Sequence, residues 1–113
     1  KNPFNTLRDE FHSGMDIAAD IGTDVMATGK GVVSFSGYKH GYGYLVIIDH
    51  DFGIETRYAH NSSLIAKLGE HVKRGDIIAK SGNTGNSTGP HIHYEIRLNG
   101  EPQDPRNYLI DYN

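Results

Sequence analysis

The sequence predicts an all-β fold: an antiparallel β-sandwich or partly open barrel with glycine-rich loops and little helix. Its 113 residues contain 14 glycines but only four prolines, a composition typical of short strands joined by tight turns. Short runs rich in β-branched and aromatic residues recur, and no long stretch keeps the 3.6-residue apolar period of a helix. A chain of this length builds one modest core, so we expect residues 1–113 to form a single domain.

The predicted strands follow one another with turns between them. They cover residues 24–28, 31–37, 45–49, 54–60, 77–80 and 91–98. Residues 50–53, which read H-D-F-G, form a turn between two apolar runs and predict a hairpin. Asn99-Gly100 is a strong turn signal after the last strand. We expect at most one helical turn, within residues 61–68.

Charge and composition exclude several classes of function. A net charge of −3 and a pI near 6.1 give no electrostatic basis for binding nucleic acid. No apolar stretch reaches the length of a membrane span, and the absence of cysteine excludes thiolate ligands, thiol nucleophiles and disulfides. Because the sequence starts at Lys1, we expect a domain cut from a longer protein, with any targeting segment or regulatory domain outside these residues.

Residues 85–97 contain the most informative pattern, an H-x-H pair that follows a glycine-rich loop. On a strand, His91 and His93 share one face while Ile92 and Tyr94 take the other. The two imidazoles then start roughly 7 Å apart and can converge on a divalent metal or on a water bound to it. An isolated H-x-H pair is more often two polar residues on a solvent-facing strand, and spacing alone leaves open which histidine is a ligand.

Other potential metal donors lie elsewhere in the chain. A catalytic zinc site needs three protein ligands and one open position. The candidate residues are His12, Asp16, His60, His91 and His93. None belongs to an H-E-x-x-H motif, which excludes the helical type of zinc peptidase site.

Three segments together resemble a known family. They are residues 12–16 (H-S-G-M-D), 58–60 (Y-A-H) and 87–95 (S-T-G-P-H-I-H-Y-E). Their order and spacing resemble the motifs of the lysostaphin-type (LytM-like) zinc metallopeptidases, a family of cell-wall endopeptidases. The resemblance covers roughly residues 11–109 and shows no departure at a motif position.

The resemblance implies a site and an activity. His12, Asp16 and His93 would bind one zinc ion, while His60 and His91 would face the attacking water and the scissile carbonyl. The substrate would be the stem peptides of bacterial peptidoglycan, with direct cross-links between D-alanine and a diamino acid favoured over glycine bridges. The protein would act in the cell envelope, in the periplasm or outside the cell.

Two other functions are compatible with such a fold. A catalytically silent module would bind the wall or activate another hydrolase, but the five site residues are all present. A phosphocarrier related to sugar phosphotransferase IIA domains is disfavoured, because H-x-G-x-D has no evident role in carrying phosphate.

Several residues near these motifs need a separate interpretation. Glu95 lies on the same predicted strand face as His91 and His93, and we expect it to support the site rather than act as the base. His40, His50 and His71 match no motif position and are expected at the surface. The three tyrosines of the glycine-rich loop either wall a peptide groove or pack within the loop, and the two interpretations are equally favoured. These are Tyr38, Tyr42 and Tyr44.

Overall fold

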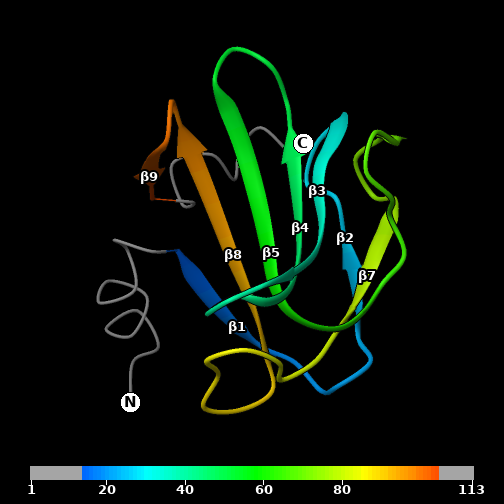
Figure 1. The fold of residues 1–113 in the computed structure, drawn as a ribbon, viewed down its shortest axis with the longest axis vertical. Coiled ribbons are helices and arrows are strands. Elements are labelled where there is room, and N and C mark those ends of the chain that lie inside the picture. Colours follow the sequence, from blue (N-terminus) through cyan, green and yellow to red (C-terminus); the bar gives the residue numbers. More distant parts are fainter. Residues whose placement is uncertain (1–13, 105–113) are drawn as a thin grey trace.

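The computed structural model describes residues 14–104, and these residues form strands and turns without a helix (Figure 1). The strands are β1 (Met15–Ala18), β2 (Asp24–Met26), β3 (Gly31–Lys39), β4 (Gly43–Asp49), β5 (Ile54–Leu64), β6 (His71–Val72), β7 (Ile77–Ser81), β8 (His91–Leu98) and β9 (Glu101–Gln103). The predicted all-β class is therefore confirmed. Among the described residues, no helix is long and apolar enough to cross a membrane.

All strand pairs are antiparallel, and the sheet is open. Its main path runs β1-β8-β5-β4-β3-β6, while β9 pairs with β8 and the β2–β7 ribbon joins through β5 (Figure 1). The long strand β5 holds this arrangement together. Its first half pairs with β4 and β8, and its last residues pair with β7.

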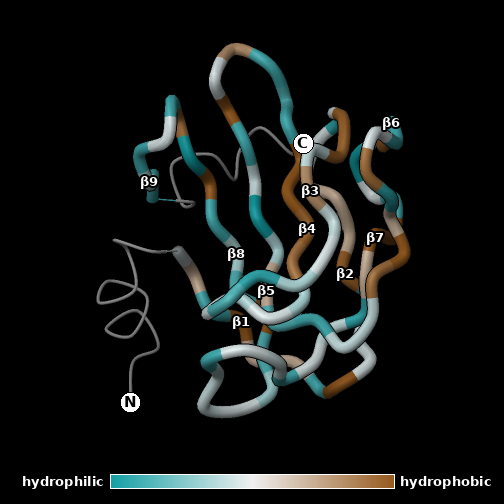
Figure 2. The backbone as a smooth tube through the Cα atoms, viewed as in Figure 1, coloured by the Kyte–Doolittle hydropathy of each residue, from teal (hydrophilic) through white to brown (hydrophobic). Residues whose placement is uncertain are grey.

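The main core lies on one face of the central strands. Several of its members come from alternate positions of β4, β5 and β8, as the two-residue period of a strand requires. They include Val46, Ile48, Tyr58, Tyr94 and Ile96. Figure 2 shows hydrophobic residues concentrated on β4 and around β7. A smaller cluster on the opposite face contains Leu45, Ile47 and Ala59. Strand β4 is thus covered on both faces, which explains its continuous apolar run.

The predicted helical turn within residues 61–68 is wrong. Residues 61–64 continue β5 and pair with β7 after a register shift between Asn61 and Ser63. The Asn61 side chain, which is fully buried, donates from Nδ2 to the carbonyls of Tyr44 and Tyr58 at 3.0 and 2.9 Å. The contact with Tyr44 and the pairing with β7 come from other segments and hold the chain extended where local sequence favoured a turn.

The predicted hairpin between β4 and β5 is confirmed. Asp51, Phe52 and Gly53 have positive φ angles of 75°, 57° and 78° at its turn. His40 and His71 are exposed as expected, but His50 is half-buried. Its Nδ1 donates to the Lys30 carbonyl at 2.7 Å, and its Nε2 lies 2.7 Å from the Thr56 hydroxyl oxygen. This pairing across the hairpin accounts for the burial of His50.

Candidate active site

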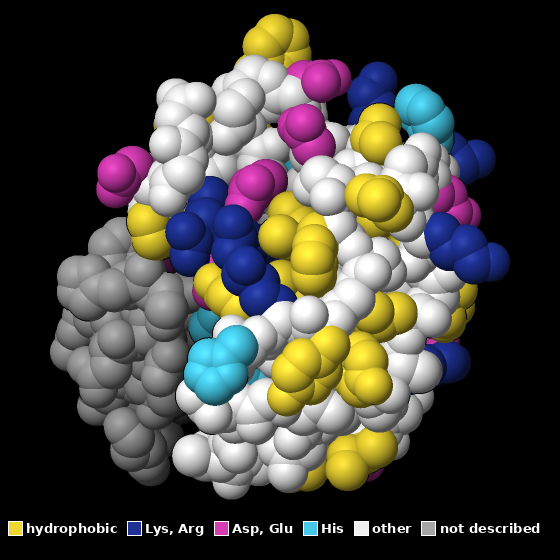
Figure 3. Space-filling view, in the orientation of Figure 1, with side chains coloured by type: hydrophobic (Ala, Val, Ile, Leu, Met, Phe, Trp, Pro, Cys, Tyr) yellow, Lys and Arg dark blue, Asp and Glu magenta, His cyan; other side chains and the backbone are white. Residues whose placement is uncertain are grey.

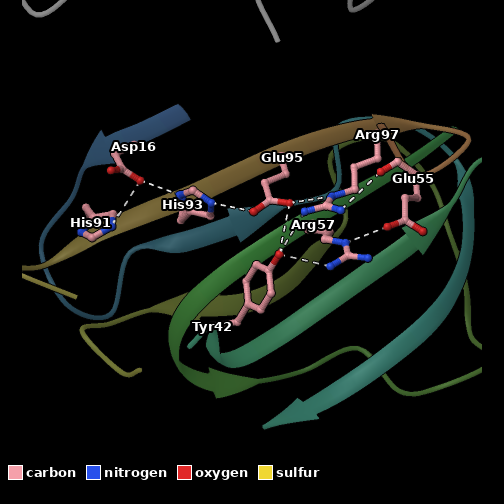
Figure 4. Close-up of polar contacts among 9 residues, drawn as sticks. Asp16, Tyr42, Glu55, Arg57, His91, His93, Glu95 and Arg97 are labelled. Carbon is pink, nitrogen blue, oxygen red and sulfur yellow. Dashed lines mark hydrogen bonds and ion pairs between the residues drawn. The ribbon is translucent and has the colours of Figure 1, made fainter. Parts of the chain in front are cut away.

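The register of three strands assembles the polar face that carries the site. Asp16 on β1 and Ala59 on β5 both lie opposite His93 on β8. The strand period then places alternate β8 residues on one face (Figure 4). They are His91, His93, Glu95 and Arg97, while Ile92, Tyr94 and Ile96 contact the core. The shared face predicted for the H-x-H pair and Glu95 is confirmed.

Asp16 meets both histidines of the pair. Its Oδ1 lies 2.7 Å from Nδ1 of His93 and 3.4 Å from Nε2 of His91. Gly14 allows β1 to approach this closely, because it has a φ of 131° and a Cβ there would lie 2.5 Å from the Tyr94 carbonyl oxygen. His12, the remaining predicted ligand, lies outside the described residues.

Glu95 holds the other nitrogen of His93. Nε2 of His93 lies 2.8 Å from Glu95 Oε2, and Arg97 Nε donates to Glu95 Oε1 at 2.9 Å. The Glu95 side chain is only 2% exposed, and both of its oxygens are engaged within the protein. Burial raises the pKa of Glu95, but the hydrogen bond and charge of His93, together with those of Arg97, lower it overall. Its contacts are those of a residue that supports His93.

His93 therefore lies between two carboxylates. Burial lowers the pKa of this imidazole, but its hydrogen bonds to Asp16 and Glu95 and the negative charges of these two residues raise it to about 9. In the metal-free protein at neutral pH, both ring nitrogens carry protons and donate to the flanking oxygens. A metal at Nδ1 would take the place of the proton that His93 shares with Asp16.

His60 enters the same face from the register break in β5. It is 6% exposed and has a φ of 63°, an uncommon angle for a residue with a side chain. Its backbone amide donates to the Tyr42 carbonyl at 2.8 Å, and its Nδ1 donates to the Thr84 carbonyl at 2.6 Å. Burial lowers the pKa of His60, as do the charges of His91 and His93, so the ring is neutral with Nε2 unprotonated.

His91 is oriented in a similar way from the other side. Its Nδ1 lies 2.7 Å from the Gly89 carbonyl oxygen, which can only accept a hydrogen bond. The His60 ring centroid lies 5.0 Å from that of His91 and 5.7 Å from that of His93. Four predicted site residues, Asp16 among them, thus converge on one small volume.

The donor chemistry at this volume fits a zinc ion. Asp16 Oδ1 and His93 Nδ1 meet directly, and a carboxylate oxygen and an imidazole nitrogen are both zinc ligands. Within residues 14–104, no group of three histidine, cysteine or acidic side chains is placed to hold a metal. The described part of the chain therefore supplies two donors, and His12 is the predicted third.

Three residues form a polar network with Glu95 that sequence reasoning missed. They are Tyr42, Arg57 and Arg97. The Tyr42 hydroxyl lies 3.2 Å from both Arg57 Nη1 and Arg97 Nη2, and 3.4 Å from Glu95 Oε1. The two-residue period from His93 through Glu95 already pointed to Arg97 on this face. No local pattern indicated the position of Tyr42, which reaches the site from the loop before β4.

The other two tyrosines of that loop are exposed. Tyr38 and Tyr44 expose 60% and 40% of their surfaces and pack edge to face, with ring centroids 5.3 Å apart. Figure 3 shows lysine and arginine side chains beside hydrophobic side chains and a histidine on one face of the molecule. Tyr42, in contrast, is half-buried in the polar network. A role for Tyr38 and Tyr44 as walls of a peptide groove stays a prediction.

A family model for peptidase family M23 matches residues 10–105 of the chain. The chain belongs to peptidase family M23. The match spans all three motif segments and confirms the resemblance to the lysostaphin-type metallopeptidases.

Named M23 relatives are similar over most of the chain. The protein named DD-carboxypeptidase/endopeptidase Mpg from Neisseria meningitidis is 50% identical over 94 residues, which are 83% of this chain and 22% of that protein. Peptidoglycan DD-endopeptidase ShyA from Vibrio cholerae is 47% identical over 92 residues, 80% of this chain and 21% of that protein. The chain thus spans about a fifth of the length of these relatives.

Solved M23 structures share the fold. A zinc-containing peptidase from Vibrio cholerae superposes with a TM-score of 0.77 at 42% identity, covering 82% of this chain and 29% of that one.

Proposed function

We propose that the chain is a zinc-dependent endopeptidase that hydrolyses the peptide cross-links of bacterial peptidoglycan, with D-alanyl–diamino acid cross-links favoured. The observation that carries the proposal is the convergence of Asp16, His60, His91 and His93 on one volume. The names of the Neisseria and Vibrio relatives, a DD-carboxypeptidase/endopeptidase and a DD-endopeptidase, favour direct cross-links. The protein would then work in the cell envelope.

Zinc would be held by His12, Asp16 and His93, and would polarise the scissile carbonyl and acidify water. His60 suits the role of general base, because its ring is neutral and its Nδ1 is committed to the Thr84 carbonyl. Its Nε2 accepts the proton of the attacking water and then donates it to the leaving amine. His91, when protonated at Nε2, stabilises the negative charge that develops on the carbonyl oxygen.

Digestion of purified sacculi tests this proposal. The protein is incubated with directly cross-linked and with pentaglycine-bridged sacculi, and the released muropeptides are separated by chromatography. We expect dimers to become monomers in the directly linked wall, and this conversion to stop when a chelator is added. His60→Ala is the matched control, since it removes the proposed base without removing a proposed ligand.

Three outcomes would contradict it. Cleavage confined to pentaglycine-bridged wall would contradict the proposed preference for direct cross-links. Trimming of pentapeptide monomers without loss of dimers would indicate a carboxypeptidase. Inactivity on both walls by a zinc-loaded protein would indicate a silent module that binds the wall or activates another hydrolase.

A further inference from the structure

The polar network extends beyond the site along β8 and β5. The register places Glu55 opposite Arg97 and Arg57 opposite Glu95, so the four charges alternate in both directions. Arg57 Nε donates to Glu55 Oε2 at 2.7 Å, and Arg97 Nε donates to Glu95 Oε1 at 2.9 Å. Because each guanidinium already faces a carboxylate, the network carries no surplus charge to attract an anionic ligand. Arg97 and Tyr42 contact Glu95, while Arg57 contacts Glu55 and Tyr42.

Tyr42 joins the two halves of this network. Arg57 Nη1 and Arg97 Nη2 both donate to its hydroxyl oxygen at 3.2 Å, which occupies the two acceptor positions of a phenol. The hydroxyl proton is then left for Glu95 Oε1 at 3.4 Å. The Tyr42 ring packs near both the site and Arg57. Its centroid lies 6.4 Å from that of the His93 ring and 5.6 Å from Arg57 Cζ.

Glu95 is consequently held from one side by Arg97 and Tyr42 and presents its second oxygen to His93 (Figure 4). If only one oxygen of a buried carboxylate had hydrogen-bond partners, the carboxylate could rotate and accept from another donor. With Oε1 fixed, Oε2 accepts from His93 Nε2. Nδ1 is therefore the nitrogen that faces Asp16.

We infer that Tyr42 and Arg97 are positioning residues for the metal site: they orient Glu95, and through it the ligand nitrogen of His93, with Arg57 supporting Tyr42. This inference rests on the proposed function, since it takes His93 as a zinc ligand. Partners of metal-ligating histidines typically change metal affinity by about 10- to 100-fold when they are lost.

Zinc affinity, measured on the whole chain by competition with a chromophoric chelator, tests the inference. We expect Arg97→Gln to weaken zinc binding by about 10-fold or more and Tyr42→Phe by a smaller factor, since the phenol contact to Glu95 is long. Arg97→Lys should recover part of the loss, because an ammonium can bind Glu95 but cannot also serve Tyr42. The absorption spectrum of the cobalt-substituted protein should change in Arg97→Gln.

Two control variants are matched to these changes. Arg74→Gln removes an exposed arginine, and Tyr44→Phe removes the hydroxyl of an exposed tyrosine outside the network. Both should bind zinc as the unmodified protein does. The double variant Tyr42→Phe/Arg97→Gln should lose less affinity than the product of the two single losses, because both act through Glu95.

Zinc affinity within twofold of the unmodified protein in both Tyr42→Phe and Arg97→Gln would overturn the inference. Multiplicative losses in the double variant would contradict a shared route through Glu95. If Arg57→Gln raised KM tenfold without changing zinc affinity, Arg57 would bind a carboxylate of the substrate instead of supporting Tyr42. Because zinc binding needs no peptidoglycan, a protein inactive on sacculi would refute the proposed function and leave this inference testable.

Discussion

His60 and His91 face each other with ring centroids 5.0 Å apart, and a backbone carbonyl holds Nδ1 of each ring. Thr84 supplies the carbonyl for His60, and Gly89 supplies it for His91. Both rings are therefore left with Nε2 for chemistry. His93 differs, because its Nε2 contacts Glu95 and its Nδ1 contacts Asp16. This contrast separates the proposed catalytic pair from the proposed ligand.

Substitutions at these positions should divide into two groups. Asp16→Ala and His93→Ala should lose zinc and activity together, because each removes a proposed ligand. His60→Ala and His91→Ala should retain zinc and lose turnover by a factor of roughly 10² or more, as expected for general acid–base groups. Zinc content is measured by metal analysis of the purified protein, and turnover by muropeptide release.

His71→Ala is a suitable control for this series, since His71 is exposed and distant from the motifs in the chain. Loss of zinc in His91→Ala together with its retention in His93→Ala would reverse the assignment of ligand and catalyst.

The stability of the metal-free protein should depend on pH through His93. Asp16 and Glu95 raise the pKa of this residue to about 9, against an ordinary value of 6.5. The folded protein then binds the proton more tightly than the unfolded chain. The stabilising effect of the protonated His93 is complete below pH 6.5 and is lost as pH rises through about 9. Urea unfolding in excess chelator should show the free energy of unfolding falling across this interval.

His93→Gln should show a smaller fall over the same pH interval, because its side chain does not titrate. If the free energy of unfolding of the metal-free protein rose from pH 6.5 to 9, His93 could not be protonated between the two carboxylates. The same conclusion would follow if the His93→Gln variant showed an equal fall.

Gly14 should be far less tolerant of a side chain than Gly22. Both have positive φ angles, 131° and 92°, but a Cβ on Gly14 would lie 2.5 Å from Tyr94 O and 2.7 Å from Glu95 Cγ. A Cβ on Gly22 meets nothing within 4 Å. We expect Gly14→Ala to lower the free energy of unfolding by about 2 kcal/mol or more and Gly22→Ala by about 1 kcal/mol, from backbone strain alone. Equal losses in urea unfolding would show that β1 does not pack as closely on β8 as described.

Asn61 should resist replacement by aspartate although the two side chains have nearly the same shape. Its Nδ2 donates to two carbonyls in a fully buried position, and aspartate would bring a charged oxygen against those carbonyls. We expect Asn61→Asp to destabilise the protein by about 3 kcal/mol or more in urea unfolding. The exposed Asn83→Asp should be close to neutral. A neutral Asn61→Asp would mean that water reaches this register break.

Much of this architecture follows from short-range patterns. The alternation of residues 91–98 predicted both the strand and the shared face of His91, His93 and Glu95, and the turn residues predicted the β4–β5 hairpin. The path of the chain after His60 was not predictable in this way, because β7 pairs with residues 61–64 from a distant part of the sequence. The same holds for Tyr42, whose role depends on arginines brought beside it by β5 and β8.

The two-residue spacing along β8 also determines which kinds of genetic change this site can survive. A substitution between His91 and Arg97 alters one side chain and leaves its neighbours in place. Deletion of a single codon within that segment would instead turn every later residue to the opposite side of the sheet, so that charged groups would face Tyr58 and its apolar neighbours. Among related sequences, insertions and deletions should therefore occur in the turns at either end of β8 and be absent within the strand.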